Sequence, residues 1–213
     1  MIDFISRLKT EILKGLPGKD VQWQMASSDR FAKSFPRHPG KDVRQAGVLI
    51  LLYPSAGSVC TVFMQRPDYN GVHGGQISFP GGKKEPEDED VTKTALREAY
   101  EETGVDPDKV DVISTLTPLF IPVSNMVVTP VVGWINKKPA FNLKHEEVLF
   151  LIYADLKKLL DPSIVKLRPF KIRGEMLEVK YFDYEGNTIW GATAMILHEF
   201  LIILRRGGFF LPE

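Results

Sequence analysis

The stretch FPGGKKEPEDEDVTKTALREAYEETGV, residues 79–105, joins a proline and two glycines to a dense group of acidic side chains. Eight of its 27 residues are Asp or Glu, although the whole chain is formally neutral, with 27 basic and 27 acidic residues. Gly81 and Gly82 permit backbone angles and close approaches that are denied to other residues. The stretch therefore predicts either a solvated acidic helix or a site that holds a cation.

The second half of this stretch predicts an α-helix from about Asp90 to Thr103. Asp88 or Asp90 can cap its N-terminus, and Gly104 can end it in a left-handed conformation. Asp88 could also be a metal ligand, and we favour the capping role. The face available for packing is small or apolar and consists of Val91, Ala95, Leu96, Ala99 and Thr103.

Three carboxylates share the other face of this helix. Residues three and four apart are neighbours on a helix, so Glu98 lies close to Glu101 and Glu102. Arg97 can reach Glu101 in the same way. Each like-charged pair costs roughly a few tenths of a kcal/mol, and a divalent cation would remove this repulsion. The helix alone favours a solvated face, but the preceding turn at Gly81 and Gly82 could lay a carbonyl beside the same cation. Mg²⁺ and Mn²⁺ prefer oxygen ligands, so the turn and the helix together favour a magnesium or manganese site.

Length and composition indicate one medium-sized globular domain. The chain has 213 residues, of which 44% are hydrophobic and 25% charged. Zero net charge argues against broad binding of nucleic acid or of an anionic membrane. The single Cys60 excludes an internal disulfide, fits a cytoplasmic location and is interpreted as a small buried hydrophobe. No segment approaches the roughly 20 apolar residues that span a bilayer.

The remaining pattern predicts many strands and few helices. Residues 1–45 are expected to form an N-terminal helix and a surface-wrapping extension, and residues 46–213 one domain. A hairpin with the turn YEGN is expected within 177–191, and a last helix over about 192–204. Other strands are predicted at 46–53, 58–66, 76–82, 110–120, 126–135 and 147–155. These elements predict an α+β fold with α/β/α sandwich layers.

The acidic stretch resembles the Nudix box, the loop–helix–loop signature G-x5-E-x7-R-E-U-x-E-E-x-G-U of Nudix hydrolases. Gly82 opens the box, and its second half is filled in register by Arg97, Glu98, Ala99, Glu101, Glu102, Gly104 and Val105. The box departs from the pattern in one respect. Asp88 stands where the first Glu belongs, and the box is one residue longer. The resemblance implies a Nudix-type sandwich with a mixed sheet.

The lengthened box looks like the coenzyme A pyrophosphatase branch of that family. Three further stretches are similar to motifs of the branch, namely FMQRPDYNGVHGGQISFPGG (63–82), SNMVVTPVVGWI (124–135) and IWGATAMIL (189–197). Departures occur at Pro67 and Gly71, where the branch has Ser and Arg, and at Phe150, where it has a second Glu. These departures put the choice of substrate in question.

The resemblance implies roles for individual residues. Glu98, Glu101, Glu102 and the Gly82 carbonyl would bind the metal. Glu98 or Glu147, the latter from a separate strand, would be the catalytic base. Arg97 is expected to orient the glutamates. Arg66 is equally suited to bind substrate phosphate or to be a surface charge at a strand end, and Trp190 is expected in the core rather than against a base.

The activity implied is a Mg²⁺- or Mn²⁺-dependent pyrophosphatase of the cytoplasm. Its substrate would be coenzyme A or an acyl-CoA, a small molecule, with no nucleic-acid or membrane partner. Other nucleoside diphosphate derivatives, such as ADP-ribose, NADH or an oxidised dNTP, are the alternative within enzymes. A non-catalytic nucleotide-binding module is the alternative from another class. A homodimer is considered, with the N-terminal helix, Phe209 and Phe210 as contact surface.

Overall fold

The computed structural model describes residues 2–27, 39–68, 74–172 and 174–210. Eight strands of this part form one mixed sheet, in which β1 runs parallel to β7 and antiparallel to β2 and β4. Its strands are β1 (Arg44–Ser55), β2 (Ser58–Gln65), β3 (Ile77–Ser78), β4 (Gly81–Lys83), β5 (Asp111–Thr115), β6 (Leu119–Ile121), β7 (Met126–Trp134) and β8 (Phe150–Asp155). The expected mixed sheet is confirmed.

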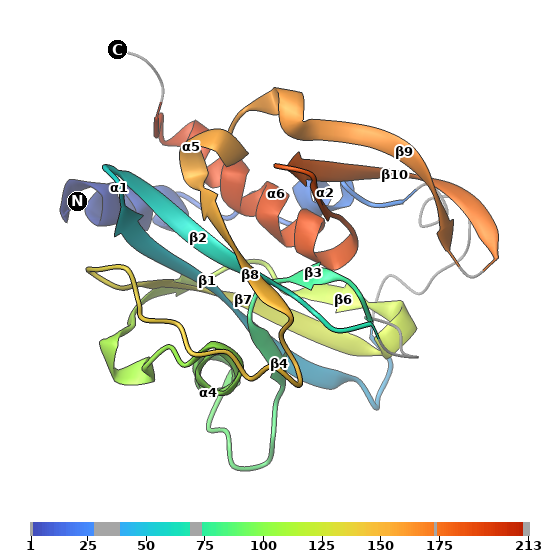
Figure 1. Cartoon of the computed structure of the whole chain (residues 1–213), viewed down its shortest axis with the longest axis horizontal. Helices are drawn as coiled ribbons and strands as arrows, with labels where there is room; N and C mark the ends of the chain where they lie inside the picture. The colour runs from blue at the N-terminus through green and yellow to red at the C-terminus, as the bar shows by residue number, and fades with distance from the viewer. Residues whose placement is uncertain (1, 28–38, 69–73, 173, 211–213) are drawn as a thin grey trace.

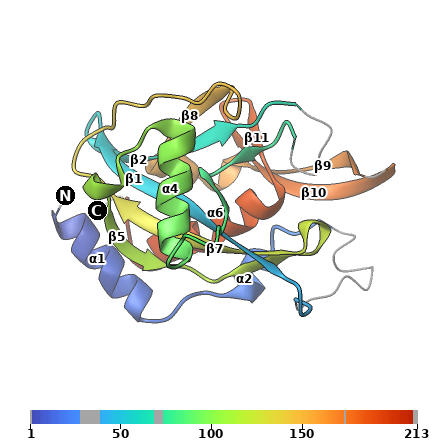
Figure 2. The same ribbon diagram turned by 90° about the horizontal axis from the view of Figure 1, so that it is seen from below.

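Helices cover both faces of this sheet, as the sandwich prediction requires (Figures 1 and 2). Helix α4 (Val91–Thr103) packs on one face, against β1 and β4. Helices α1 (Ile2–Leu13), α2 (Lys19–Trp23) and α6 (Gly191–Arg206) lie together on the other. Two apolar clusters separate the layers, one under α4 and a larger one around α6. Burial of these faces is the main force that holds the layers together.

Three predicted strands differ from the observed ones. The run 76–82 is not one strand, because Pro80 has no backbone N–H for a ladder. It forms β3, which pairs with β2, and β4, which pairs with β1. The run 110–120 likewise divides into β5 and β6, which both pair with β7. The predicted strand 147–155 begins only at Phe150, so Glu147 lies in the turn before β8 and not on a strand.

A second sheet of three strands lies beside α6. It consists of β9 (Val165–Ile172), β10 (Glu175–Tyr184) and β11 (Asn187–Ile189). The predicted turn is confirmed, since Glu185 and Gly186 join β10 to β11. Strand β9 was not predicted. It contains Pro169, and most of its side chains are exposed, so it lacks the alternating apolar pattern of a half-buried strand.

Short helices complete the fold. Helix α5 (Leu156–Leu159) follows β8, and three 3₁₀ turns, η1 (Pro107–Lys109), η2 (Pro122–Ser124) and η3 (Pro162–Ile164), each begin at a proline. Proline suits these first positions because its φ is already near the helical value. No helix of the described residues is long and apolar enough to cross a membrane.

A buried carboxylate ties the N-terminal extension to the rest of the chain. Glu199 of α6 has no exposed surface. It accepts hydrogen bonds from the Gly18 N–H at 3.0 Å, from the Gln22 amide at 2.9 Å and from the Thr117 hydroxyl. Met25 and Leu8 belong to the same cluster as α6. The extension thus shares the core of the domain, and the boundary at residue 46 stays a prediction.

The surface considered for a homodimer is largely internal. Phe209 is only 3% exposed and packs edge-on against Phe4, with ring centroids 4.9 Å apart. The Arg7 guanidinium lies 4.8 Å from the centre of the Phe209 ring. These contacts dock the end of the described chain onto α1, and dimerisation stays a prediction.

We predict that Glu199→Ala lowers the free energy of unfolding by about 2–4 kcal/mol, because it leaves one buried and two partly buried donors without this acceptor. Urea denaturation measures this change. Glu178→Ala, at an exposed position on β10, is the control and should change stability by less than about 0.5 kcal/mol. Equal urea midpoints for the two variants would contradict a stabilising role for the hydrogen bonds to Glu199.

Candidate active site

Helix α4 is held at both ends as its sequence requires. The Asp90 carboxylate accepts hydrogen bonds from the backbone N–H groups of Thr92 and Lys93 at 2.8 and 2.9 Å, so Asp90 is the N-cap. Gly104 ends the helix with a φ of 73°, in the left-handed region, as predicted. The favoured capping role of Asp88 is wrong, because that side chain has a different partner.

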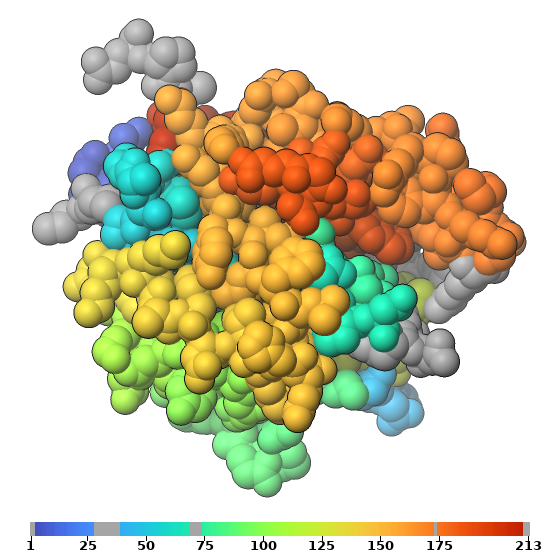
Figure 3. All heavy atoms as spheres, viewed as in Figure 1, coloured from blue at the N-terminus to red at the C-terminus, as the bar shows by residue number. Residues whose placement is uncertain are grey.

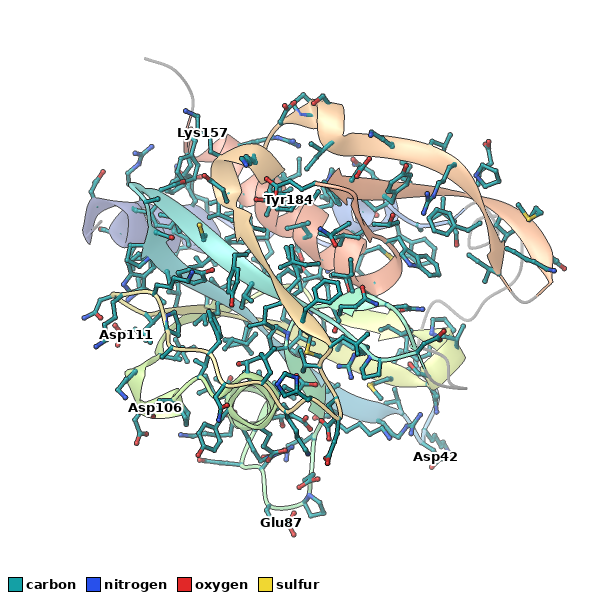
Figure 4. All side chains as sticks on the ribbon, in the orientation of Figure 1. Asp42, Glu87, Asp106, Asp111, Lys157 and Tyr184 are labelled. Atoms are coloured by element: carbon teal, nitrogen blue, oxygen red, sulfur yellow. The ribbon has the colours of Figure 1, made fainter. Side chains whose placement is uncertain are left out.

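Asp88 and Arg97 form a clamp between the loop and the helix. Both oxygens of the Asp88 carboxylate accept from Arg97, each at 2.9 Å. Asp88 also accepts from the Glu85 N–H and from the Thr94 hydroxyl, and it is 7% exposed. The Arg97 guanidinium is the main cause that holds the pKa of Asp88 far below its usual value. The loop is therefore fastened at its base, while Glu87 lies at its outer tip (Figure 4).

The rest of the Arg97 guanidinium orients the acidic face of the helix. It donates to Glu98 and Glu101 at 3.2 Å each, and to the backbone carbonyl of Lys83 at 3.1 Å. One planar cation thus fixes two carboxylates relative to the end of β4. Arg97 therefore lies beside the glutamates that it was expected to orient, and the orienting role stays a prediction.

A cavity of about 440 Å³ brings together five of the seven residues expected in the metal and catalytic sites or at the phosphate. Gly82, Glu98, Glu102, Glu147 and Arg66 all line it. Arg97 stands behind this set. Glu101 does not line the cavity; its side chain is 43% exposed and pairs with Arg97.

Glu102 is the most buried carboxylate of the cavity, with 1% exposure. It accepts the Gly81 N–H at 2.7 Å and lies 3.4 Å from an Arg66 nitrogen. Burial raises the pKa of Glu102 to about 7, with further increases from the charges of Glu98 and Glu147, whereas Arg66 lowers it. The carboxylate is costly to keep ionised here without a cation.

Glu98 is a partly buried acid and lies directly against Gly82. A Cβ on Gly82 would stand 2.3 Å from the Glu98 carboxyl carbon, so only glycine leaves room for that carboxylate. Burial raises the pKa of Glu98, as do Glu101 and Glu147 to a smaller extent, while Arg97 lowers it. The backbone of β4 and the helix carboxylates therefore share one small space.

This donor set fits a hard divalent cation. Carboxylate and carbonyl oxygens are the ligands that Mg²⁺ and Mn²⁺ prefer, and the carboxylates raise one another's pKa. Within the described ranges, no three acidic, His or Cys side chains are already grouped as a metal site. Each carboxylate is held by protein donors instead. Glu147, for example, pairs with Lys144 at 2.7 Å.

The position of Arg66 bears on the two roles considered for it, phosphate binding and a surface charge at a strand end. It follows β2, and its side chain is 23% exposed. Besides Glu102 it contacts the Ser78 hydroxyl at 3.2 Å and the Gly81 carbonyl at 3.0 Å. It is thus no surface charge, but a cation that lies at the wall of the cavity.

An apolar wall faces the carboxylates and was not predicted as part of the site. Its side chains come from β6, β7 and α6, and include Ile121, Met126, Val128 and Ile196. The stretches 124–135 and 189–197 carry most of these residues, so the motif matches there were the available signal. The cavity therefore has one acidic end and one apolar end.

Three other residues that the sequence analysis singled out are Trp190, Cys60 and Gly71. Trp190 is not in the core: it is half-buried and stacks on Phe170, with ring centroids 5.2 Å apart. Cys60 is half-buried rather than buried, and burial raises the pKa of its thiol. Gly71, where the branch motif has Arg, lies outside the described residues.

Comparison with known proteins places the box within a matching domain. The model of the NUDIX domain matches residues 43–187. Nudix hydrolase 15, mitochondrial, of Arabidopsis thaliana is 36% identical over 161 residues, which cover 72% of this chain and 56% of that protein. The peroxisomal coenzyme A diphosphatase NUDT7 of Mus musculus is 33% identical over 138 residues, covering 65% and 58%.

A solved structure agrees with the fold. The crystal structure of the MutT protein from Methanosarcina mazei Go1 superposes with a TM-score of 0.51 at 16% identity, covering 79% of this chain and 99% of that one. The matches to the two curated relatives span a little over half the length of those proteins.

We predict that Asp88→Asn lowers the free energy of unfolding by about 2 kcal/mol at pH 7, because Arg97 loses its charged partner. The folded-state pKa of Asp88 lies below the unfolded value, so this contribution is present above about pH 4 and is lost as pH falls toward the folded value. Denaturation curves of wild type and variant should therefore converge at low pH.

Asp111→Asn, at an exposed position on β5, is the matched control and should leave stability unchanged at every pH. A constant difference between wild type and Asp88→Asn from pH 7 to pH 3 would contradict the ionic clamp.

Proposed function

This chain belongs to the Nudix family, and from that premise we propose that it hydrolyses the diphosphate bond of coenzyme A or an acyl-CoA. The products would be 3′,5′-ADP and 4′-phosphopantetheine or its acyl form. The observation that carries the proposal is the convergence of Gly82, Glu98, Glu102 and Glu147 on one cavity. Three carboxylates on one cavity, of which Glu102 is buried, suit a cation that binds a diphosphate.

In this proposal Glu98, Glu101, Glu102 and the Gly82 carbonyl hold Mg²⁺ or Mn²⁺. The bound ion would neutralise the diphosphate and make a water more acidic. Arg97 keeps Glu98 in place through one ion pair, and through another it holds Glu101 outside the cavity. Glu101 would turn from its exposed position toward the cavity, a rotation that its 43% exposure leaves open.

The base that receives the proton from the attacking water is Glu98 or Glu147. Both line the cavity, and Glu147 comes from the turn before β8, in a segment whose Lys144 N–H donates a hydrogen bond to the Glu102 carbonyl of α4. Arg66 is suited to bind a phosphate oxygen, because its guanidinium already lies at the wall beside Glu102. A cation on Glu102 would release Arg66 for that contact.

Two observations support coenzyme A as the substrate. One relative with 33% identity is named a coenzyme A diphosphatase. The apolar wall that includes Ile121, Met126 and Ile196 faces the acidic end of the cavity. In coenzyme A a carbon with two methyl groups lies next to the diphosphate, and such a group is favourably buried against this wall.

The alternative functions place another nucleotide in the same cavity, either as a substrate or as a ligand that is bound without catalysis. ADP-ribose, NADH or an oxidised dNTP would use the same carboxylates. A non-catalytic nucleotide-binding module would not need them, so the retention of Glu98, Glu101 and Glu102 argues against it. The cytoplasmic location stays a prediction, since the relatives above carry mitochondrial and peroxisomal names.

We predict that Glu98→Gln, Glu101→Gln and Glu102→Gln each lower kcat/KM at least about 100-fold and weaken Mn²⁺ binding about 10- to 100-fold, because each removes a negative ligand. Manganese EPR measures binding, and product release measures turnover. Glu87→Gln, at the outer tip of the loop, is the control. A Glu101→Gln enzyme with unchanged activity and metal affinity would remove Glu101 from the site.

A hydrolysis panel with Mg²⁺ or Mn²⁺ tests the substrate. It contains coenzyme A, acetyl-CoA, ADP-ribose, NADH and 8-oxo-dGTP, and products are identified by mass. We expect preferential release of 3′,5′-ADP from the two CoA compounds. Preference for another substrate would keep the Nudix chemistry and discard coenzyme A, and no turnover of any compound would favour the binding module.

A further inference from the structure

A second cavity, of about 300 Å³, lies on the other side of a thin wall from the first. Residues that are adjacent in sequence line different cavities. Ile77 of β3 lines the second cavity and Ser78 the first, and Gln65 lines the second while Arg66 lines the first. Consecutive Cα atoms are about 3.8 Å apart, so the wall is one strand thick. The two cavities are therefore close neighbours on the two sides of this wall.

The far side of the second cavity is built from the three-stranded sheet. Strand β11 contacts β3, and in Figure 3 the β9–β10 hairpin (orange) lies above the segment around β3 (turquoise). Arg168 and Phe170 come from β9, Thr188 from β11, and Trp190 from the residue before α6. Segments about 100 residues apart in the chain thus close around one space.

Arg168 is placed in this cavity by its contacts. Its guanidinium lies 4.5 Å from the centre of the Phe170 ring and 4.8 Å from that of Tyr181. It also donates to the Thr188 hydroxyl at 3.1 Å. The nearby Asp183 pairs with Lys166, and within the described residues no carboxylate lies within ion-pair distance of Arg168. The cation is oriented and has donors left for an anion.

The two cavities differ in charge. The first is lined by four glutamates, Glu85, Glu98, Glu102 and Glu147, and by two cations, Arg66 and Lys83. Arg168 alone carries a full charge among the described residues that line the second. The N-terminal end of α6, where Trp190 gives no side-chain cap, lies between them. The positive end of that helix dipole adds to the charge of Arg168.

We propose that the second cavity binds a phosphomonoester on the ribose of the nucleoside part of the substrate, with Arg168 as its partner. The inference rests on the proposed function, because it assigns the diphosphate to the first cavity and the ribose phosphate to the second. A guanidinium matches the oxygens of a phosphate, and the uncharged Gln65, Asn187 and Thr188 add hydrogen-bonding groups around it. Arg168 is a specificity-determining residue in this arrangement.

The test compares coenzyme A with 3′-dephospho-CoA, which differ only in that phosphate. We expect Arg168→Ala to raise KM for coenzyme A about 10- to 100-fold with kcat changed less than about twofold, the loss expected for one charged hydrogen-bonded contact. For 3′-dephospho-CoA, KM should change less than about twofold. Equal effects on the two substrates, or no effect on coenzyme A, would overturn the assignment.

Lys171→Ala is the matched control. Lys171 lies on the same strand but, by strand alternation, on the face opposite Phe170, so it removes the same charge from outside the cavity. It should leave both KM values unchanged. An effect as large as that of Arg168→Ala would mean that the general charge of the hairpin, and not the cavity, attracts the substrate.

A binding measurement separates this inference from the proposed hydrolysis. Calorimetry with 3′,5′-ADP and with 5′-AMP reports recognition of the 3′-phosphate even if neither CoA compound is cleaved. We expect the wild type to prefer 3′,5′-ADP at least about tenfold and Arg168→Ala to lose the preference. Equal affinities in the wild type would overturn the inference, whereas a lack of CoA cleavage would overturn only the proposed function.

Discussion

The Arg97 guanidinium is the interaction on which the acidic site depends. It bridges the buried Asp88 of the loop, the Lys83 carbonyl at the end of β4, and Glu98 and Glu101 of α4. A buried carboxylate without a partner would be expensive, so Asp88 holds the loop only because Arg97 is there. The same guanidinium sets the direction of the helix carboxylates. A single cation thus couples the stability of the loop to the geometry of the cavity.

The cavity concentrates negative charge that the protein balances only in part. Glu102 is almost fully buried and is held by the Gly81 N–H and Arg66, and Glu98 fills the space that a side chain on Gly82 would take. Burial raises the pKa values of both acids, and neighbouring carboxylates add to this to a smaller extent. A divalent cation compensates such charge without extra side-chain volume, which is the physical basis of the metal proposal. The apolar wall then limits what can lie beside the charged group.

The two cavities together describe a substrate with charge at two points. The first offers oxygen ligands for a cation and an apolar wall, and the second offers Arg168 beside aromatic rings. In the proposed arrangement, a molecule with a diphosphate and a further phosphate a few bonds away places one group on each side of the separating strand. The three-stranded sheet, which has no part in the box itself, then gains a role in choosing the substrate.

Local sequence determined the elements whose signals lie within a few residues of one another. The limits of α4, its Gly104 end and the shared face of Glu98 and Glu102 all follow from helical spacing and turn chemistry. Tertiary structure decided which of these carboxylates is buried, because that depends on how α4 lies against β1 and β4. It also brought Arg66 to Glu102 and Arg168 to the far side of β3, through strand pairings that periodicity does not encode. Spacing along the chain determines which chemical role a residue can have, and packing across the sheet determines which residues it contacts.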